Sequence, residues 1–484
     1  MIVPYQGFIG GSYHGTSRRV GVEQCLNWIP EINGGPGVRP SSQMSFHPTP
    51  GTKTFTTAGT GPVRGVTFEN GRLVCVSGAE VYSVNASGTA TKLGDVEPSQ
   101  EASRIRGNGS GGKQFLIESG SKGYLWNWDT GAFGVVASVN FPSNCSAIDF
   151  VDGYFLALNR DSRQVNYSNL FDGVTWDALD LFQKSQTTDD IRNLAVINKL
   201  VYLHGSTTTE IWQNTGDALV TFQPVQGVPI EHGIDAPDGL SRVGESMAWL
   251  GMDAHGAHVA WRDVNYAPSR ISNYAVEQEW ASYGRTDNAE AFTYRWRGHT
   301  LFVVSFPTAK RTWVADMDTN PPIWHEWGYH NPATGLQEHA LGRCHAFGFG
   351  KHIVGSRLDG TLYELGGRYD ADTTPIRRVR RAPHVSVPQR SLTINRFAMM
   401  VDTGIAASSG QGSDPRIMFR SSIDGGMTYS DEILLETGKL GQYRTRVEIN
   451  RLGQGEDWVL EAATSEPIEQ SWSDASIDAV ADAA

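Results

Sequence analysis

Short apolar segments recur along the middle of the chain, from about residue 60 to residue 370. Within them the side chains follow the two-residue period of a β-strand, as Leu73 and Cys75 do against Val74 and Val76. The segments are RLVCVS at Arg72, QFLIES at Gln114, YFLALN at Tyr154, KLVYLHG at Lys199, MAWLG at Met247, LFVVSF at Leu301 and HIVGS at His352. Their starts lie 40 to 54 residues apart, which is close to the length of one four-stranded propeller blade.

In most units a polar turn follows, and then a second predicted strand with an aromatic residue near its middle. These aromatic residues are Tyr82, Trp126, Tyr167, Trp212, Trp261, Trp313 and Tyr363. Because one blade buries only part of each of its faces, we expect these rings to pack between neighbouring blades. The sequence therefore predicts an all-β fold with a β-propeller of about seven blades at residues 56–375. Six or eight blades, or a sandwich of unrelated hairpins, are the alternatives.

Three segments lie outside this repeat. Residues 1–55 are rich in glycine, serine and proline, which predicts an extended N-terminal arm that crosses the surface. Strand-like segments recur from residue 376 to residue 475 and predict a separate C-terminal β-sandwich. The last residues, 476–484, are acidic and small, so we expect a loose tail there.

Composition narrows the class of protein. The 484 residues carry 40 Lys and Arg against 52 Asp and Glu, a net charge of −12, which argues against a basic surface that grips nucleic acid along the whole chain. No apolar run approaches the roughly 18 residues that a membrane helix needs, and the first residues lack the pattern of a signal peptide. We therefore expect no membrane insertion by this chain. The four cysteines are far apart and form no C-x-x-C pair, which indicates reduced, buried thiols.

Several short motifs suggest chemistry that the sequence does not support. Gly107–Gln114 resembles a phosphate-binding loop, but Gln114 stands where a metal-binding Ser or Thr is required and a strand follows it. His255 and His258 are not part of an H-E-x-x-H helix. Ser421–Tyr429 resembles an Asp-box turn, which stabilises a hairpin and performs no reaction. We expect no catalytic residue, no cofactor and no metal site.

A basic run follows the predicted propeller. Arg377, Arg378, Arg380 and Arg381 lie within five positions, and their guanidinium groups repel one another unless carboxylates or phosphates accompany them. One interpretation is a solvated linker strand paired with local acids. The other is a contact with a neighbouring subunit or with DNA in a channel.

The whole-chain pattern resembles the packaged-DNA stabilisation proteins of short-tailed phages (podoviruses), also called tail hubs or tail accessory factors. The matching segments are NWIPE at 27–31, TPG at 49–51, HGSTTTEIW at 204–212, DGGMTY at 424–429, GKLGQY at 438–443, NRLG at 450–453 and DWV at 457–459. Tyr429 departs from the family pattern, which usually has Trp at that position. The closing block is the most specific part of the resemblance.

The resemblance implies a structural virion protein of the phage tail, not an enzyme, assembled in the host cytoplasm. Such a protein forms a ring of six copies, docks under the portal adaptor (head-to-tail connector), closes the DNA exit channel and retains packaged double-stranded DNA. It also carries tail fibres or spikes and a needle or plug. In such a ring the N-terminal arm could clasp a neighbouring copy.

Two other functions are compatible with the sequence. A phage glycoside hydrolase, or depolymerase, would need two carboxylates about 5 to 10 Å apart in a groove. A carbohydrate-binding tail protein would instead present exposed tryptophans as stacking platforms.

Overall fold

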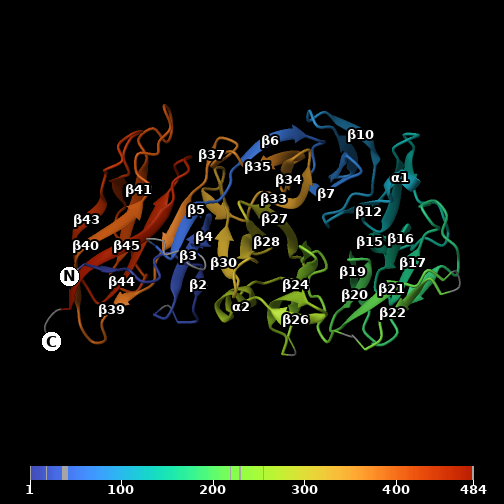
Figure 1. The fold of residues 1–484 in the computed structure, drawn as a ribbon, viewed down its shortest axis with the longest axis horizontal. Helices are drawn as coiled ribbons and strands as arrows, with labels where there is room; N and C mark the ends of the chain where they lie inside the picture. The colour runs from blue at the N-terminus through green and yellow to red at the C-terminus, as the bar shows by residue number, and fades with distance from the viewer. Residues whose placement is uncertain are drawn as a thin grey trace.

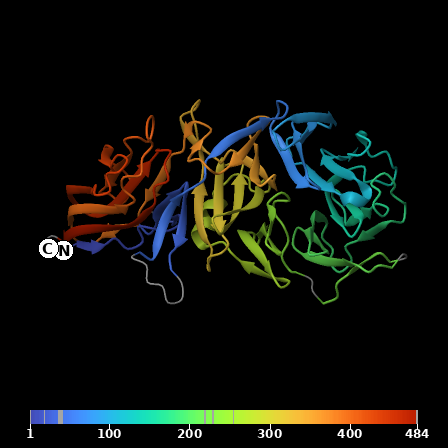
Figure 2. The ribbon, with the colours of Figure 1, turned by 45° about the horizontal axis from the view of Figure 1, so that its top comes forward.

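The computed structural model describes residues 2–17, 19–34, 42–217, 220–227, 230–253 and 255–481. The molecule is elongated, with a propeller at one end and a sandwich at the other (Figure 1). The first and last strands of the chain, β1 (Ile2–Pro4) and β45 (Trp472–Ala481), pair with each other in the sandwich (Figures 1 and 2).

Seven four-stranded antiparallel blades form the propeller. Blade 1 contains β7 (Val63–Glu69), β8 (Arg72–Ser77), β9 (Glu80–Val84) and β10 (Ala90–Asp95). Blade 2 contains β11 (Arg104–Gly107), β12 (Gln114–Ser119), β13 (Lys122–Asn127) and β14 (Phe133–Val135). Blade 3 contains β15 (Cys145–Val151), β16 (Tyr154–Asn159), β17 (Gln164–Tyr167) and β18 (Leu181–Gln183). Blade 4 contains β19 (Ile191–Ile197), β20 (Leu200–Gly205), β21 (Thr209–Asn214) and β22 (Phe222–Pro224). Blade 5 contains β23 (Leu240–Val243), β24 (Ser246–Met252), β25 (His258–Val264) and β26 (Ala267–Arg270). Blade 6 contains β27 (Glu290–Trp296), β28 (His299–Phe306), β29 (Arg311–Asp316) and β30 (Ile323–Trp327). The prediction of an all-β fold with a propeller is confirmed.

Blade 7 closes the ring with a strand from the start of the chain. Its own strands are β33 (Gly342–Gly348), β34 (Lys351–Ser356) and β35 (Thr361–Leu365), and β6 (Thr52–Thr57) adds the fourth. The pairing is antiparallel, from Thr57 opposite Thr361 to Thr52 opposite Leu365. Because β6 directly precedes blade 1, its hydrogen bonds must break before blades 7 and 1 can separate. Residues 52–55, expected in the arm, thus belong to the propeller.

Tight turns mark one face of the propeller. At the end of the innermost strand of several blades the chain reverses through two residues with positive φ, such as Asn70–Gly71 and Asp152–Gly153. Turns of this hand match the right-handed twist of the strands that they join. We call this end of the propeller the turn face; it carries the β7–β8, β15–β16 and β19–β20 turns.

The seven predicted aromatic residues all lie in or against clusters that two neighbouring blades share. Trp126 lies between blades 1 and 2, Tyr167 and Trp212 between blades 3 and 4, Trp261 between blades 4 and 5, and Trp313 between blades 5 and 6. These five side chains are at most 8% exposed. Tyr82 is half-buried against the cluster between blades 7 and 1, and Tyr363 is half-buried against the cluster between blades 6 and 7. That these rings set the blade packing stays a prediction.

The sandwich is built from both ends of the chain. One sheet contains β4 (Trp28–Ile32), β5 (Met44–Pro48), β45, β40 (Leu392–Val401) and β43 (Val447–Gly455), with β1 beside β45. The facing strands are β38 (Arg378–Arg381), β39 (Val385–Ser386), β44 (Asp457–Thr464), β41 (Arg416–Ser422) and β42 (Ile433–Glu436). Trp28, Trp458 and Trp472 are buried in the core between them. The predicted C-terminal sandwich is confirmed.

Two expectations about the chain ends are wrong. Residues 476–481, expected to be a loose tail, belong to β45, which pairs along its length with β40; residues 482–484 lie outside the described residues. Strands β1, β4 and β5 of the expected arm are part of the sandwich sheet. The short polar side chains that suggested flexibility alternate with buried ones such as Ala475 and Ile477, so the strand is half-buried rather than loose.

The remaining elements are short. They are β2 (Tyr13–His14), β3 (Val22–Leu26), β31 (Tyr329–Asn331), β32 (Leu336–Glu338), β36 (Asp370–Ala371), β37 (Thr374–Pro375), α1 (Gly109–Gly112) and α2 (Tyr274–Ala281). Among the described residues no helix has the length and apolar character needed to cross a bilayer. All four cysteines are free, and three of them are buried.

Replacing one inter-blade ring tests the packing account. Trp313 is 1% exposed and its indole donates to the Tyr283 hydroxyl at 2.9 Å. We expect Trp313→Ala to lower the free energy of unfolding by about 3 to 5 kcal/mol, because a cavity remains between two blades. Urea unfolding followed by circular dichroism measures this. The control Tyr443→Ala, at a side chain that is 71% exposed, should change it by less than about 0.5 kcal/mol. Equal effects of the two substitutions would contradict the account.

Candidate functional site: the domain joint and the propeller axis

One continuous sheet joins the propeller to the sandwich. Strand β3 lies between blade 6 and the sandwich, parallel to β30 on one side and antiparallel to β38 on the other. Strand β38 then pairs with β44, so eleven strands from both domains belong to one sheet. Backbone hydrogen bonds, rather than a flexible linker, therefore fix the two domains to each other.

Asn27 reinforces this joint where β3 ends. The residue has a φ of 58° and is 3% exposed. Its side-chain amide donates to the carbonyls of Gly328 and Arg377 at 2.9 and 2.8 Å, and its carbonyl oxygen accepts from the Gly328 amide. One asparagine thus connects the N-terminal segment, blade 6 and the start of β38, because its side chain can both donate and accept hydrogen bonds.

The basic run forms β38, and two of its arginines are buried inside the joint. Arg380 is 1% exposed, and its guanidinium donates to five backbone carbonyls at 2.6 to 3.4 Å, those of Gly7, Phe8, Gly10, Gly11 and Gln24. None of the described carboxylates forms an ion pair with it. Burial lowers the pKa of Arg380, but the carbonyl dipoles compensate its charge.

Arg378 binds a second set of segments in the same way. It is fully buried and donates to the carbonyls of Tyr369 at 2.8 Å and of Thr49 and Glu466 at 3.4 and 3.3 Å. Burial lowers the pKa of Arg378 to about 10, so the side chain is still a cation at neutral pH. The two buried arginines hold chain segments that come from both ends of the sequence.

The other two arginines face a more exposed side of the strand. Arg381 pairs with Glu461 at 2.9 Å, which also accepts from Arg420 at 2.6 Å. Both guanidinium groups lie over the ring of Tyr429, at 5.5 and 4.6 Å from its centre. Arg377 pairs with Glu432 at 2.8 Å.

The two interpretations of the basic run therefore have different outcomes for its buried and its partly exposed arginines. A subunit or DNA contact is wrong for Arg378 and Arg380, because their side chains are buried and backbone carbonyls of the same chain accept their hydrogen bonds. For Arg377 and Arg381, which remain partly exposed, such a contact stays a prediction. No local pattern could have identified the carbonyl partners, since those of Arg380 lie more than 350 residues away in the sequence.

Two histidines attach the N-terminal segment to the propeller. His14, in β2, lies 3.4 Å from Glu279 and 3.7 Å from Glu326. His299, in blade 6, lies 2.8 Å from Asp316 and 3.7 Å from Glu31 of β4. Burial opposes the charged form of His14, but its bond with Glu279 and the nearby carboxylates outweigh burial and raise its pKa. The hydrogen bond with Asp316 likewise raises the pKa of His299.

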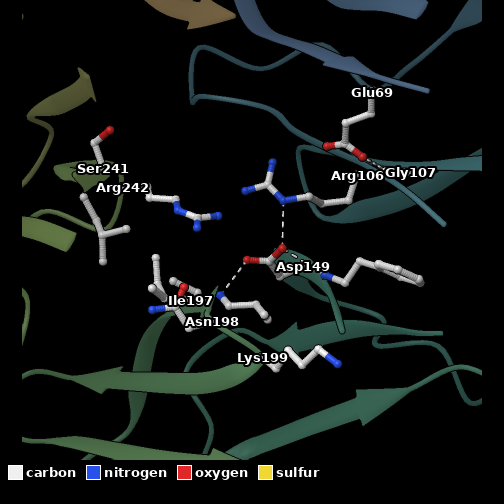
Figure 3. A pocket seen from close by; sticks show the side chains of 13 residues that line it. Glu69, Arg106, Gly107, Asp149, Ile197, Asn198, Lys199, Ser241 and Arg242 are labelled. Atoms are coloured by element: carbon white, nitrogen blue, oxygen red, sulfur yellow. Dashed lines mark hydrogen bonds and ion pairs between the residues drawn. The ribbon is translucent and has the colours of Figure 1, made fainter. Parts of the chain in front are cut away.

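Ion pairs fill the axis of the propeller, where the first strands of neighbouring blades contact one another. Arg106 of blade 2 pairs with Asp149 of blade 3 at 2.7 Å, and Arg104 pairs with Asp238 at 3.1 Å. Arg343 of blade 7 pairs with Glu290 of blade 6 at 2.7 Å. A cavity of about 630 Å³ opens at the turn face (Figure 3), and a second of about 180 Å³ lies among the inner strands.

The axial network links different blades to one another. Asp149 and Glu290 each pair with a guanidinium from a neighbouring blade, whereas Asp238, just before blade 5, pairs with Arg104 of blade 2 across the axis. Across the described ranges no group of three His, Cys, Asp or Glu side chains could hold a metal ion.

Removing the Arg380 side chain tests the role of the joint. We expect Arg380→Met to lower the free energy of unfolding by about 3 to 5 kcal/mol, because five backbone carbonyls, one buried and four partly buried, lose their donor. It should also expose residues 2–26 to limited proteolysis. Urea unfolding followed by tryptophan fluorescence gives the first quantity. The matched control Arg377→Met, at a partly exposed pair, should cost less than about 1 kcal/mol. If both variants lost the same stability, the hydrogen bonds from the buried Arg380 side chain to backbone carbonyls would not be the basis of the joint.

The pH dependence of the His14 contact has a definite sign. A raised folded-state pKa means that charged His14 stabilises the fold fully below its unfolded pKa of about 6.5, and this contribution disappears as the pH rises through the folded pKa. We expect His14→Gln to destabilise the protein more at pH 5.5 than at pH 8.5, as measured by urea unfolding at both values. The control His255→Gln, in an exposed loop, should show no such difference. A larger loss at pH 8.5 would refute this assignment.

Comparison with known proteins agrees with this architecture. The family described as "Bacteriophage P22 Gp10, beta-propeller" matches residues 36–369. The family described as "Bacteriophage P22 Gp10, beta-sandwich" matches residues 377–479. The boundary between the two falls just before β38. None of the curated protein sequences matches the chain.

Similarity to solved structures is weak. Virginiamycin B lyase from Staphylococcus aureus is 9% identical over 63% of this chain and 94% of that chain, with a TM-score of 0.43. A chain of the Mitotic Checkpoint Complex is 9% identical over 69% of this chain and 97% of that chain, with a TM-score of 0.41. At this level of similarity neither structure identifies the family. The two family matches cover residues 36–369 and 377–479, so the chain belongs to the bacteriophage P22 Gp10 family of podovirus tail proteins.

Proposed function

We propose that the chain is the hub of a short phage tail. Six copies form a ring under the portal adaptor, close the DNA exit channel and retain packaged double-stranded DNA. The same ring carries tail fibres or spikes and a needle or plug. The observation that carries this proposal is that both Gp10 domains match in chain order, from residue 36 to residue 479.

The joint suits a protein that must resist mechanical force. A hub that withstands the pressure of packaged DNA needs two domains that do not move against each other. The eleven-stranded sheet and the buried guanidiniums of Arg378 and Arg380 supply this connection. A fixed pair of domains also presents surfaces at a constant distance to the adaptor on one side and to fibres on the other.

The DNA conduit of such a ring lies between copies and not through a propeller. The axis of each propeller is occupied by ion pairs, and the cavities described above among its residues hold only about 630 and 180 Å³. A duplex whose major groove alone is about 12 Å wide does not fit there. The net charge of −12 suits a conduit along which DNA slides, since it limits the counterion-releasing grip that basic linings produce.

The strands of the N-terminal segment are engaged within their own chain. Strands β1, β3, β4, β5 and β6 pair with the sandwich or the propeller of the same copy. The expected clasp on a neighbouring copy therefore has little support, and contacts between copies in the proposed ring come from other surfaces.

The carbohydrate-related alternatives are less well supported. Trp126, Trp212, Trp261 and Trp313 are 1 to 8% exposed, so these rings are unavailable for stacking on sugars. The carboxylates of the axial network are engaged in ion pairs, and neither of the two families is described as a hydrolase.

DNA retention by filled heads tests the proposal. Heads assembled without this chain should release their DNA to added nuclease, and purified wild-type chain should restore protection. Arg285→Met, at an exposed pair with Asp287, should restore protection as well as the wild type does, whereas Arg380→Met, with a loosened joint, should protect less. Heads that keep their DNA without the chain would overturn the proposal. So would release of sugar from capsule or lipopolysaccharide by the purified chain.

A further inference from the structure

The axial cavity at the turn face has features that the tail role does not use. Its walls come from five of the seven blades, through strands β7, β11, β15 and β19 and the start of β23. Three cations line it, Arg106, Lys199 and Arg242, against two carboxylates, Glu69 and Asp149. At about 630 Å³ it is large enough for a small ligand.

Arg242 is the cation with free donors. Figure 3 shows its side chain extending into the cavity toward the Arg106–Asp149 pair. Its Nε donates to the Gly244 carbonyl at 2.9 Å, but within the part of the chain that the structure describes its two terminal nitrogens have no protein partner. Two guanidiniums that approach across a cavity repel each other unless an anion lies between them.

The two carboxylates are already engaged. Asp149 accepts from Arg106 at 2.7 Å and from the amides of Phe150 and Val196 at 2.9 and 2.8 Å. Glu69 accepts from the Gly107 amide at 2.6 Å and from the Thr67 hydroxyl at 3.1 Å. Burial raises the pKa of Glu69, which favours its uncharged form. Neither carboxylate satisfies Arg242.

Arg106 also retains a free donor on this side. Its Nε binds Asp149 and one terminal nitrogen donates to the Ile105 carbonyl at 3.0 Å, while the other terminal nitrogen has no partner among the described residues. The guanidiniums of Arg106 and Arg242 together have three terminal nitrogens without a partner among the described residues. A planar guanidinium with two free nitrogens, as in Arg242, matches the oxygens of phosphate with two parallel hydrogen bonds, and Arg106 can add one more.

We propose that this cavity binds a phosphate group between the guanidiniums of Arg106 and Arg242. The ligand is free inorganic phosphate or the phosphate of a mononucleotide. All residues of the site belong to one propeller, so it does not depend on the hub proposal.

Isothermal titration calorimetry of the full chain at low ionic strength tests the site. We expect inorganic phosphate to bind with one site per chain. Arg242→Gln should weaken binding at least tenfold, and Arg106→Gln should weaken it as strongly. The control Arg285→Gln removes an exposed arginine outside the cavity and should change the dissociation constant less than twofold. Because Arg242 is exposed, its variant should keep the wild-type melting temperature.

Further titrations identify the source of the phosphate. Thymidine monophosphate binding tenfold tighter than inorganic phosphate would support a nucleotide ligand, and equal affinities would support free phosphate. Acetate is the competing probe: if it displaces phosphate at equal concentration, the assignment to phosphate is overturned. Absence of phosphate binding, or binding that survives both Arg242→Gln and Arg106→Gln, would also overturn it.

Discussion

The capture of backbone carbonyls by two buried guanidiniums is the interaction on which the rest of this structure depends. Arg380 and Arg378 lie in β38, the strand that links propeller and sandwich, and each binds segments that are distant in sequence. An arginine without a carboxylate partner is tolerated in a protein interior only where many dipoles converge on it. Here the N-terminal segment provides the largest set of carbonyls, which ties the fold of both domains to that segment.

This arrangement makes the N-terminal segment the central connector of the molecule. Within its first 57 residues the chain contributes strands to the sandwich, to the joint and to the last propeller blade. Sandwich, joint and propeller closure are therefore coupled, since loss of the segment would open all three.

The propeller could largely be predicted from the sequence, because its signal is local and repeated. Each apolar strand and each aromatic residue near the middle of a second strand recurs once per blade, and the Trp residues predicted between blades are buried there. The closing strand β6 was missed because its pairing with β35 is set by contacts about 300 residues apart. The tail was misjudged because small acidic residues hide the alternating buried positions of β45.

The candidate site was predictable only in part. The four arginines stood out by their charge density, but burial of Arg378 and Arg380 follows from a sheet that no local pattern reveals. The axial ion pairs were also missed, since Arg106 and Asp149 lie in different blades and carry no motif. One signal could have identified these pairs: a charged residue inside the first strand of successive blades. The two-residue alternation of the strand predicts that such a side chain points toward the propeller axis.

The central claim is that this chain is a rigid two-domain unit whose copies surround the DNA. An image reconstruction of the whole phage particle tests it most directly. The account predicts a closed ring of this chain below the portal, with DNA on the ring axis, each propeller axis away from the DNA, and the two domains joined through β38 as described. Density for DNA passing through a propeller, or propellers and sandwiches at variable angles to each other, would contradict it.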